Sequence, residues 1–519
     1  MAEHRWTKAA LLAAIVAFTA LFTTLLGARY HGLQSYDPRD EAVNNQILHN
    51  TAHGRLVFST VKGDAVFHRH FRPIFVPLAV PYIVHSGPLT YYLTTSLILA
   101  LGALFAFGLG RSLFGDDRFA LLAGLAWLMF PPVHELALGN FDPETIAATF
   151  WLGAFYFFHR RLPKPFWLFA LLAVCCKETH APILAAFGVL ALIQKRRWTW
   201  IAPPIAVGCA WFILAVTTII PAYTPEFRMV YNRLAGVESP HFWHDFLHSI
   251  STDPAAVFAQ IFNPEDGYLL GKLLLAGGGA ALLSPLSLLP VGSIVIQILL
   301  HKDPLPVRQA HMLAGLIPFL FAATLLGIKR VANRWPNNRR LPALLLAGLL
   351  GWSLLATALP GPFGPGRTYG EEDYLPTTLF DPEWYAASEV AIAAGPLLEK
   401  IPPDAIVMTN ERYLLPLSSR AELREFGTQK TLEDFADMDF LLIGLTQPRC
   451  PTCTYALPTP HALRLAVQLI TSGRFTVLET TEFAVLLQQN SKATPNNLKT
   501  QHAIQSLNMV ARQSTPDGH

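Results

Sequence analysis

Long apolar runs separated by short polar segments occupy the first 360 residues of the chain. Most of these runs approach the ~20 residues that a helix needs to cross a hydrocarbon core of ~30 Å. We therefore expect about eleven transmembrane helices, at residues 8–28, 88–113, 118–135, 143–158, 165–176, 181–194, 198–221, 268–283, 284–300, 309–327 and 341–359. The first run is longer than the core of a signal peptide and many similar runs follow it, so we expect it to be retained.

The positions of the basic residues predict how these helices are oriented. Basic residues cluster in four predicted loops, around residues 111–118, 159–164, 195–197 and 329–340. With this set of helices, all four loops lie on the same side as the N-terminus, and the positive-inside rule places that side in the cytoplasm. We therefore expect a polytopic α-helical membrane protein with its N-terminus inside, and with the loop 29–87 and everything after residue 360 on the external side.

The apolar segment Phe71–His85 does not fit this series of crossings. It is short and interrupted by prolines, and both of its neighbours are expected on the external side. We interpret it as an interfacial or re-entrant segment.

The composition changes after residue 360 to that of a soluble domain. Helical periodicity at 384–400 and 461–472 alternates with strand patterns at 405–408 and 440–445 and with a hairpin pattern at 475–478 and 483–487. This pattern predicts a membrane domain over 1–360 and a small external α/β domain over 361–489. The tail 490–519 is polar without periodicity, and we expect it to be disordered.

The overall composition agrees with a membrane protein. The chain is 52% hydrophobic and only 14% charged, whereas about 25% of residues are charged in ordinary soluble proteins. The net charge of +3 is too small to indicate a nucleic-acid partner. Cys450 and Cys453 lie in the predicted external domain, where an oxidising compartment favours a disulfide between them. A zinc site would need two further ligands, and the chain has no second CxxC pair.

The predicted first external loop is dense in ionisable groups. Its opening contains Asp37, Asp40 and Glu41, and its end contains His70 and Arg72. Carboxylates, imidazoles and guanidinium groups directly after an apolar span suggest chemistry at the membrane surface. His68 and His70, together with Glu41 or Asp64, could bind a divalent metal ion, but two imidazoles without a defined third ligand do not assign one.

Several short motifs resemble a known family. They are Asp40 to Gly54 with Gln46 and His53 inside it, His70-Phe71-Arg72-Pro73, Asn140-Phe141-Asp142-Pro143-Glu144, Lys177-Glu178, and His311 to Phe319. Together and in this order they resemble the signature of uncharacterised bacterial membrane proteins with domain of unknown function 2079. That family in turn resembles the GT-C type glycosyltransferases, which are membrane enzymes that use lipid-phosphate-linked sugars.

The resemblance implies roles for particular residues. It implies a catalytic carboxylate in the first external loop, for which Asp40 has the matching spacing, with Glu41 and Asp37 as alternatives. Sugar transfer from a polyprenyl phosphate needs a base for the acceptor hydroxyl and positive charge for the leaving phosphate. The candidates for phosphate binding are His70, Arg72, Lys177 and His311. The candidates for supporting roles are Gln46, His53, Asp142, Glu144 and Glu178.

The implied reaction is an inverting transfer of a hexose or pentose. Its partners would be a polyprenyl-phosphate-linked sugar, membrane lipid and an acceptor that is a glycan, a lipid or a protein. Asn140 and Asp142 depart from the Asp and His that the family has there, so His134 or His180 could take over the histidine's role.

Simpler explanations exist for each of these residues. Asp40 could cap a helix, Asp142 to Glu144 could be a helix start, and Lys177-Glu178 could be a structural ion pair. The alternative function is a transporter or lipid-handling protein. The absence of an internal repeat and the placement of the charges at one side favour the transferase. A scaffold that presents the C-terminal domain would leave the charged loop unexplained.

Overall fold

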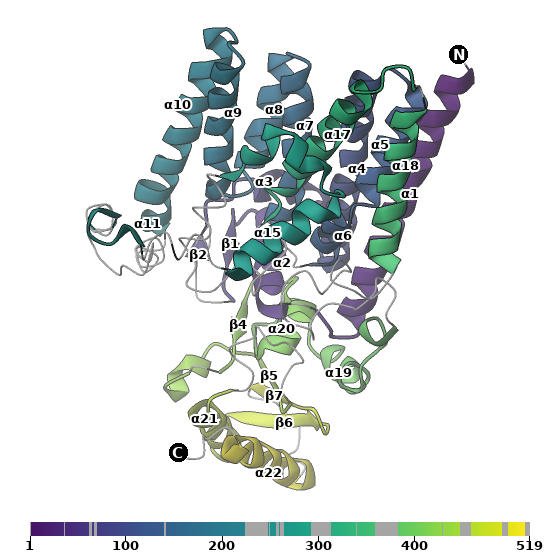
Figure 1. The fold of residues 1–519 in the computed structure, drawn as a ribbon. Helices are drawn as coiled ribbons and strands as arrows, with labels where there is room; N and C mark the ends of the chain where they lie inside the picture. The colour runs from purple at the N-terminus through teal and green to yellow at the C-terminus, as the bar shows by residue number, and fades with distance from the viewer. Residues whose placement is uncertain are drawn as a thin grey trace. The chain divides into compact units, whose positions relative to one another are not determined.

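The computed structural model describes residues 2–35, 37–61, 65–66, 70–139, 142–223, 248, 250–255, 259, 264–291, 313–338, 340–358, 382–427, 429–446, 458–489 and 497–513. The chain forms two compact units (Figure 1). The helical unit comprises Met1–Thr24, Phe67–Ile74 and Leu93–Asp381. The mixed unit comprises Leu25–Val66, Phe75–Tyr92 and Pro382–His519. Most of the first loop therefore belongs with the C-terminal segment, whereas the sequence suggested that it belongs with the membrane domain.

Four helical stretches in the described part of the chain are long and apolar enough to cross a membrane. They are Arg5–His31 within α1 (Ala2–His31), α4 (Pro88–Phe114), Trp198–Tyr223 and α18 (Leu341–Ala358). The third combines α10 (Trp198–Leu214), the π-helical turn η4 (Ala215–Ile219) and α11 (Ile220–Tyr223). A fifth span is formed if α5 (Asp117–Leu128) and α6 (Pro131–Leu138), which are bent by 43° at their break, count as one crossing.

The predicted spans at 143–194 form helices that are too short to cross alone. They are α7 (Ala147–His159), α8 (Pro163–Val174) and α9 (Ala181–Ile193), each of 12 or 13 residues. The 3-10 turns η2 (Pro143–Ile146) and η3 (Glu178–His180) precede α7 and α9. At 1.5 Å per residue these helices are about 20 Å long, well below the ~30 Å of a hydrocarbon core. The count of eleven crossings therefore stays a prediction.

The predicted span 268–283 is not a continuous helix. The helix α15 (Pro264–Ala276) ends at glycines, and Gly278 and Gly279 have φ of 63° and 72°, a conformation that glycine adopts without steric cost. The turns η7 (Ala280–Leu283) and η8 (Pro285–Leu288) follow. Of the next two predicted spans, the structure describes α17 (Ile317–Asn333), whereas residues 292–312 lie outside the described ranges.

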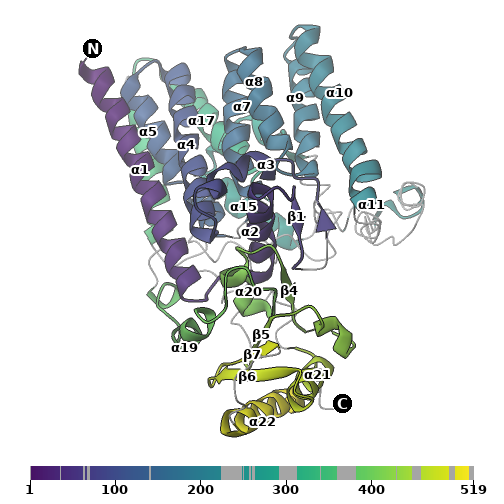
Figure 2. The same ribbon diagram turned by 180° about the vertical axis from the view of Figure 1, so that it is seen from behind.

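The four basic loops lie at one end of the helical unit, together with the N-terminus (Figures 1 and 2). The guanidinium group of Arg196, after α9, lies 3.7 Å from the ring centroid of Phe158 at the end of α7. The ammonium group of Lys329, near the end of α17, lies 5.7 Å from the ring centroid of Phe114 at the end of α4. The shared side that the sequence predicted for these loops is therefore present in the fold, and its assignment to the cytoplasm stays a prediction.

The mixed unit contains a five-stranded sheet with the order β4-β3-β5-β7-β6. The strands are β3 (Val407–Thr409), β4 (Leu423–Glu425), β5 (Phe440–Gly444), β6 (Phe475–Thr480) and β7 (Ala484–Gln489). β3 pairs in parallel with β4 and β5, whereas β7 pairs antiparallel with β5 and β6. The predicted α/β content is confirmed, although the sequence analysis missed the short edge strand β4.

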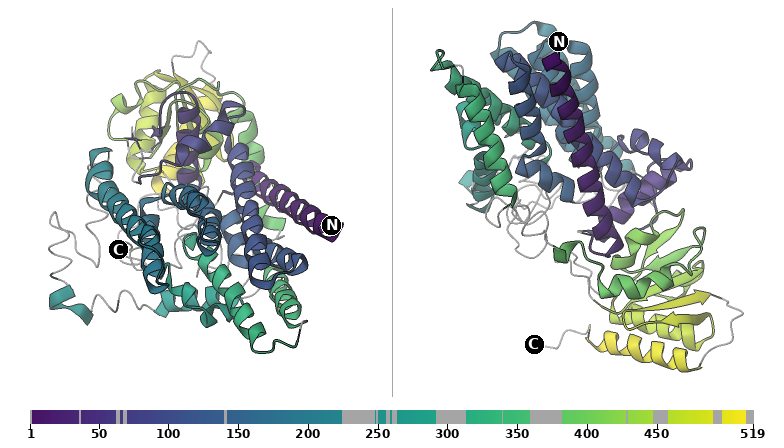
Figure 3. Two further views of the ribbon diagram at one scale, coloured as in Figure 1. Left: turned by 90° about the horizontal axis from the view of Figure 1, so that it is seen from above. Right: turned by 90° about the vertical axis from the view of Figure 1, so that its right-hand side faces the viewer.

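In its described C-terminal part, the same unit contains four helices and two 3-10 turns. They are α19 (Glu389–Leu398), α20 (Glu411–Leu417), α21 (Pro460–Thr471), α22 (Asn497–Gln513) and the turns η11 (Pro382–Trp384) and η12 (Leu432–Phe435). α22 corrects the expectation of a disordered tail, because its Ala503 and Leu507 are fully buried in the core that α21 forms with β5, β6 and β7. Figure 3 shows α22 as a regular helix in yellow near the C-terminus. Its apolar positions recur at helical spacing within a polar segment, and that amphipathic pattern was overlooked.

The first loop supplies α2 (Pro38–Ala52), the short strands β1 (Phe58–Ser59) and β2 (Ala65–Val66), α3 (Phe75–Leu78) and the turn η1 (Val80–Ile83). α3 and η1 correspond to the predicted interfacial segment. Phe75 and Tyr82 are buried on one side of this segment, whereas Val80 and Ile83 on the other side are 61% and 70% exposed. An apolar face without protein cover agrees with a segment that lies against lipid.

Candidate functional site

The first turn of α2 separates the roles of two neighbouring carboxylates. Asp37 is the N-cap residue, and its Oδ1 accepts a hydrogen bond from the backbone N–H of Asp40 at 3.0 Å. Pro38 at the first helical position lacks an N–H and costs the helix no hydrogen bond. The capping role that the sequence left open for Asp40 therefore belongs to Asp37, and Asp40 follows three residues later with a partly exposed side chain.

Glu41 is buried, with only 3% of its surface exposed. Its Oε2 accepts a hydrogen bond from the hydroxyl of Tyr92 at 3.0 Å. Burial raises the pKa of Glu41 to about 7, against the lowering effect of Arg29 and of the tyrosine hydroxyl. Of the three predicted carboxylates, Asp37 caps the helix, Glu41 is buried and Asp40 is partly exposed.

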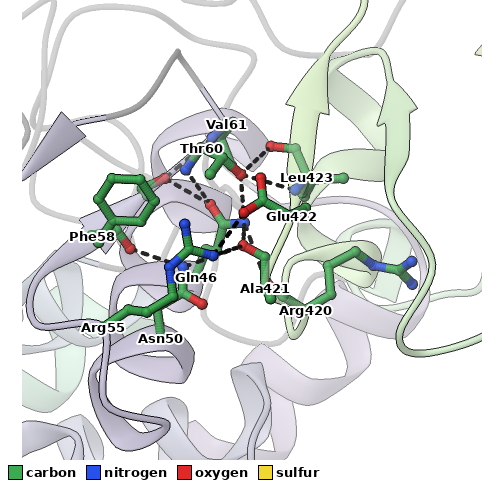
Figure 4. Close-up of polar contacts among 11 residues, drawn as sticks. Gln46, Asn50, Arg55, Phe58, Thr60, Val61, Arg420, Ala421, Glu422 and Leu423 are labelled. Atoms are coloured by element: carbon green, nitrogen blue, oxygen red, sulfur yellow. Dashed lines mark hydrogen bonds and ion pairs between the residues drawn. The ribbon is translucent and has the colours of Figure 1, made fainter. Parts of the chain in front are cut away.

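Gln46 holds α2 against the C-terminal part of the mixed unit (Figure 4). Its Oε1 accepts hydrogen bonds from Ser59 Oγ and from the Thr60 N–H, both at 2.8 Å. Its Nε2 donates to Thr60 Oγ1 and to the carbonyl oxygens of Arg420 and Ala421. This fully buried amide satisfies main-chain groups on two segments, so the structure gives it an architectural role.

Two ion pairs reinforce the same attachment. Arg39 donates from Nε to both carboxylate oxygens of Glu425, at 2.9 and 3.0 Å, and Arg55 pairs with Glu422 at 2.7 Å. His53 ends α2 with an exposed side chain, and its Nδ1 lies 2.7 Å from the carbonyl oxygen of His49 in its own helix. Gln46 and the two ion pairs thus fix α2 within the mixed unit.

In the helical unit, the predicted phosphate-binding residues gather with buried carboxylates at η2 and η3. Arg72 Nη2 lies 3.0 Å from Asp142 Oδ2, and both side chains are nearly buried. The other oxygen of Asp142 caps η2 by accepting the Glu144 N–H at 2.8 Å. The helix-start explanation for Asp142 is therefore correct, and the same carboxylate also binds the guanidinium group.

Lys177 and Glu178 point to different partners instead of pairing with each other. Lys177 Nζ donates to Glu144 Oε2 at 2.7 Å. Glu178 accepts a hydrogen bond from the backbone N–H of Phe71 at 3.0 Å and lies 2.8 Å from Nδ1 of His70. Burial lowers the pKa of His70 below its ordinary value, although Glu178 opposes this shift. These contacts join residues 70–72 to η2 and η3.

His180 is a member of this cluster that the sequence analysis mentioned only as a substitute. Its Nε2 lies 3.3 Å from Glu144 Oε1, and its Nδ1 accepts a hydrogen bond from Trp151 Nε1 at 3.0 Å. Trp151 was not considered, because a tryptophan inside an apolar run looks like an ordinary core residue. His134, the other substitute, instead lies with Nε2 2.6 Å from the Leu128 carbonyl oxygen among aromatic side chains.

The other predicted site residues lie in parts of the chain that the structure does not describe. His311, Cys450 and Cys453 lie in residues that the structure does not describe, as do His68 and Asp64. Within the described ranges, no group of three or more His, Cys, Asp or Glu side chains is arranged to hold a metal ion. In that part of the chain the cluster is therefore a set of ion pairs in which Arg72 and Lys177 each have a carboxylate partner.

The family described as "Predicted membrane protein (DUF2079)" matches residues 38–479. The chain belongs to this family. The match includes α2 and the buried cluster, and it extends through the sheet to β6. No curated protein matches the chain.

Solved structures show the fold class. The crystal structure of ArnT from Cupriavidus metallidurans bound to undecaprenyl phosphate covers 93% of this chain and 99% of that chain, with a TM-score of 0.54 and 13% identity. The apo structure of the same protein covers 92% and 98%, with a TM-score of 0.50 and 13% identity. The oligosaccharyltransferase of Archaeoglobus fulgidus matches with a TM-score of only 0.41. The resemblance to the GT-C type is confirmed for the fold, which by itself does not establish an activity.

Proposed function

We propose that this membrane protein is a glycosyltransferase that moves a sugar from a polyprenyl-phosphate donor to an acceptor on the external face of the bacterial cytoplasmic membrane. One observation carries the proposal: in a unit of apolar helices, a lysine is buried at a helix break and an arginine is buried against the carboxylate of a second break. Charges inside a membrane domain are costly and mark functional sites. The η2 and η3 turns lie at the ends of α7 and α9 that are opposite the basic loops, as expected for a site that faces the external leaflet.

Lys177 is suited to hold a phosphate while it keeps its carboxylate partner. An ammonium group has three N–H donors, and one of them is directed to Glu144. When the bond between the anomeric carbon and the phosphate oxygen breaks, negative charge grows on the departing polyprenyl phosphate. Donors in a buried site stabilise such charge more strongly than donors in water.

Asp40 is the proposed base in the mixed unit. It would accept the proton of the acceptor hydroxyl as that oxygen bonds to the anomeric carbon, and polyprenyl phosphate would leave with the bonding electron pair. A positioned general base contributes typically ~10²–10⁴ in rate. We expect Asp40→Asn to lose transfer by about this factor, measured as polyprenyl phosphate released from a panel of polyprenyl-phosphate sugars. Glu433→Gln, at an exposed position of η12, is the control.

Lipid binding tests the donor assignment without knowledge of the sugar. The purified chain in nanodiscs is titrated with undecaprenyl phosphate and with undecaprenol, which lacks the phosphate, and binding is measured by native mass spectrometry. We expect the phosphate lipid to bind more tightly. The double variant Lys177→Gln/Glu144→Gln, which keeps a neutral hydrogen-bonded pair, should lose this preference, whereas Lys195→Gln in a basic loop should keep it.

The outcome separates the transferase from its alternative. Equal binding of the two lipids by the native chain would overturn the donor assignment. Phosphate-dependent binding without release of polyprenyl phosphate from any sugar donor, in a chain with Asp40 intact, would instead favour a lipid-handling protein.

A further inference from the structure

The side chain of His180 is held in one orientation and one tautomer. A tryptophan indole is only a hydrogen-bond donor, so the 3.0 Å contact from Trp151 Nε1 requires Nδ1 of His180 to be an acceptor. In neutral imidazole the other nitrogen then carries the proton. That N–H is directed to the side of Glu144, whose Oε1 lies 3.3 Å from Nε2.

The residues around the imidazole ring pack closely against it and its indole partner. Trp151 and His180 are both fully buried. The indole stacks on Phe187 at 5.8 Å between ring centroids and contacts Phe319 at 6.1 Å. A Cβ atom at Gly315 would lie 3.1 Å from Nδ1 of His180, which is tighter than ordinary van der Waals contact. The glycine is therefore needed for the close approach of its backbone to this ring.

The tautomer of His180 determines whether an N–H group or a lone pair faces Oε1 of Glu144, the carboxylate oxygen that does not bind Lys177. With the proton on Nε2, the positive end of the N–H dipole faces Oε1 of Glu144. The two atoms are 3.3 Å apart, but their alignment is not that of a full hydrogen bond. With the proton on Nδ1, a lone pair would face the carboxylate and repel it. Electrostatic effects of this kind are strong in a dry interior. The tautomer thus stabilises the carboxylate that binds the ammonium group of Lys177.

We propose that Trp151 and His180 are positioning residues that act through Glu144 on Lys177, so that the ammonium group is held for an anionic phosphate. This inference rests on the proposed function, because it assigns the phosphate of the lipid donor to Lys177. It adds two residues whose side chains act on the ammonium group of Lys177 through Glu144. It also gives a reason for an indole N–H to be buried next to an ionised pair.

Variants at position 180 separate positioning from packing. In His180→Gln the amide can accept from Trp151 and donate to Glu144, whereas His180→Leu removes both functions. We expect His180→Leu and Trp151→Phe each to weaken undecaprenyl phosphate binding about three- to tenfold, the range for loss of one hydrogen bond. His180→Gln should stay within about twofold of the native chain.

Trp127→Phe is the matched control. Trp127 is also a fully buried tryptophan of the helical unit, and its Nε1 donates to the carbonyl oxygen of Leu99 at 2.9 Å. This variant loses an indole N–H and a similar volume at a place without contact to Glu144. We expect its phosphate-lipid binding to be unchanged, and thermal unfolding of both tryptophan variants shows whether they fold equally well.

Two further measurements respond to positioning and not to packing. In a double-mutant cycle, Trp151→Phe should have no additional effect on binding in a His180→Leu background. In the native chain labelled with ¹⁵N-histidine, the signals that disappear in His180→Gln should show Nε2 protonated and Nδ1 bare. A protonated Nδ1, additive effects in the cycle, or equal losses for His180→Gln and His180→Leu would each overturn the proposal.

Comparing these variants with Lys177→Gln/Glu144→Gln distinguishes an error in the positioning role from an error in the proposed function. If Lys177→Gln/Glu144→Gln abolishes the preference for undecaprenyl phosphate while the position-180 variants do not affect it, the positioning role is wrong and the donor assignment stands. If neither set changes binding, the donor assignment itself is wrong.

Discussion

The two units hold their buried polar groups in different ways. In the helical unit the cluster at η2 and η3 consists of formal charges, with Arg72 and Lys177 bound to carboxylates that are themselves buried. In the mixed unit the attachment of α2 depends mainly on a neutral amide, hydroxyls and backbone carbonyl oxygens around Gln46. One network requires charge to be taken out of water, and the other only requires hydrogen bonds to be completed.

This difference indicates which network is architectural. Completing the hydrogen bonds of a buried main chain is a general requirement of folding, and Gln46 meets it at little cost. A buried ion pair recovers its desolvation penalty only with good geometry, and apolar residues of similar volume often serve stability equally well. The charged cluster is therefore expected to matter for ligand binding, and the amide network for stability.

Lys177→Met in the charged network is expected to have the largest effect on stability. It leaves the carboxylate of Glu144 buried without its ammonium partner, and loss of one member of a buried pair costs ~3–5 kcal/mol. We expect a large drop in the unfolding temperature of the purified chain. Lys177→Met/Glu144→Leu should recover most of it without recovering phosphate-lipid binding. A double variant no more stable than the single one would show that the pair does not act as a unit.

A pH titration tests the buried carboxyl of Glu41, whose pKa is raised strongly in the mixed unit. The pKa of Glu41 is about 7 in the folded chain against an ordinary value of 4.5. Below pH 4.5 Glu41 is protonated in both states and costs nothing. As the pH rises to 7, the unfolded chain ionises first, so the free energy of unfolding should fall by about 3 kcal/mol from this group. Chemical unfolding at several pH values should show this slope, and Glu41→Gln should remove it.

Gln46→Leu tests the neutral network. It leaves the Thr60 N–H and two carbonyl oxygens without their amide partner in a buried place, and we expect a loss of ~2–3 kcal/mol. Hydrogen exchange should show faster exchange at the N–H groups of residues 60 and 423. Gln501→Leu on the exposed side of α22 is the control. Unchanged exchange in Gln46→Leu would contradict the architectural role.

The smallest expected effect is that of Glu425→Gln. Its ion pair with Arg39 is partly exposed, with side chains 15% and 17% accessible. Pairs near the surface contribute ~1 kcal/mol or less. Thermal unfolding should therefore change little, and the change should shrink further in high salt. A loss as large as that of Gln46→Leu would mean that charge contributes to the attachment as much as the amide does.

The parts of the fold that depend on local patterns could be predicted from the sequence. The hairpin of β6 and β7, the helix α21 and the strand β5 each have apolar positions at the spacing of their element. β4 is only three residues long, and its strand conformation depends on pairing with β3. α22 was missed because its apolar side chains are few and its burial depends on the sheet that it covers.

For the candidate site, residue types could be predicted but not their partners. The resemblance to the family implied roles for Arg72, Lys177 and Glu144, and charges next to apolar runs are also unusual in membrane helices. Their pairing depends on how η2, η3 and residues 70–72 come together over more than a hundred positions of chain, and no local pattern encodes that. The indole N–H of Trp151 could not be found in this way, because the sequence does not show which core tryptophan meets a histidine.

The short helices α8 and α9 have a consequence for the lipid around them. Their exposed Leu168 and Val189 would face hydrocarbon, yet helices of this length match a slab ~10 Å thinner than an average bilayer. Hydrophobic mismatch costs fractions of a kcal/mol per Å, so the bilayer should thin locally or water should penetrate as far as η3. At such a thinned place the phosphate headgroup of the proposed donor would have less hydrocarbon to cross before it reaches Lys177.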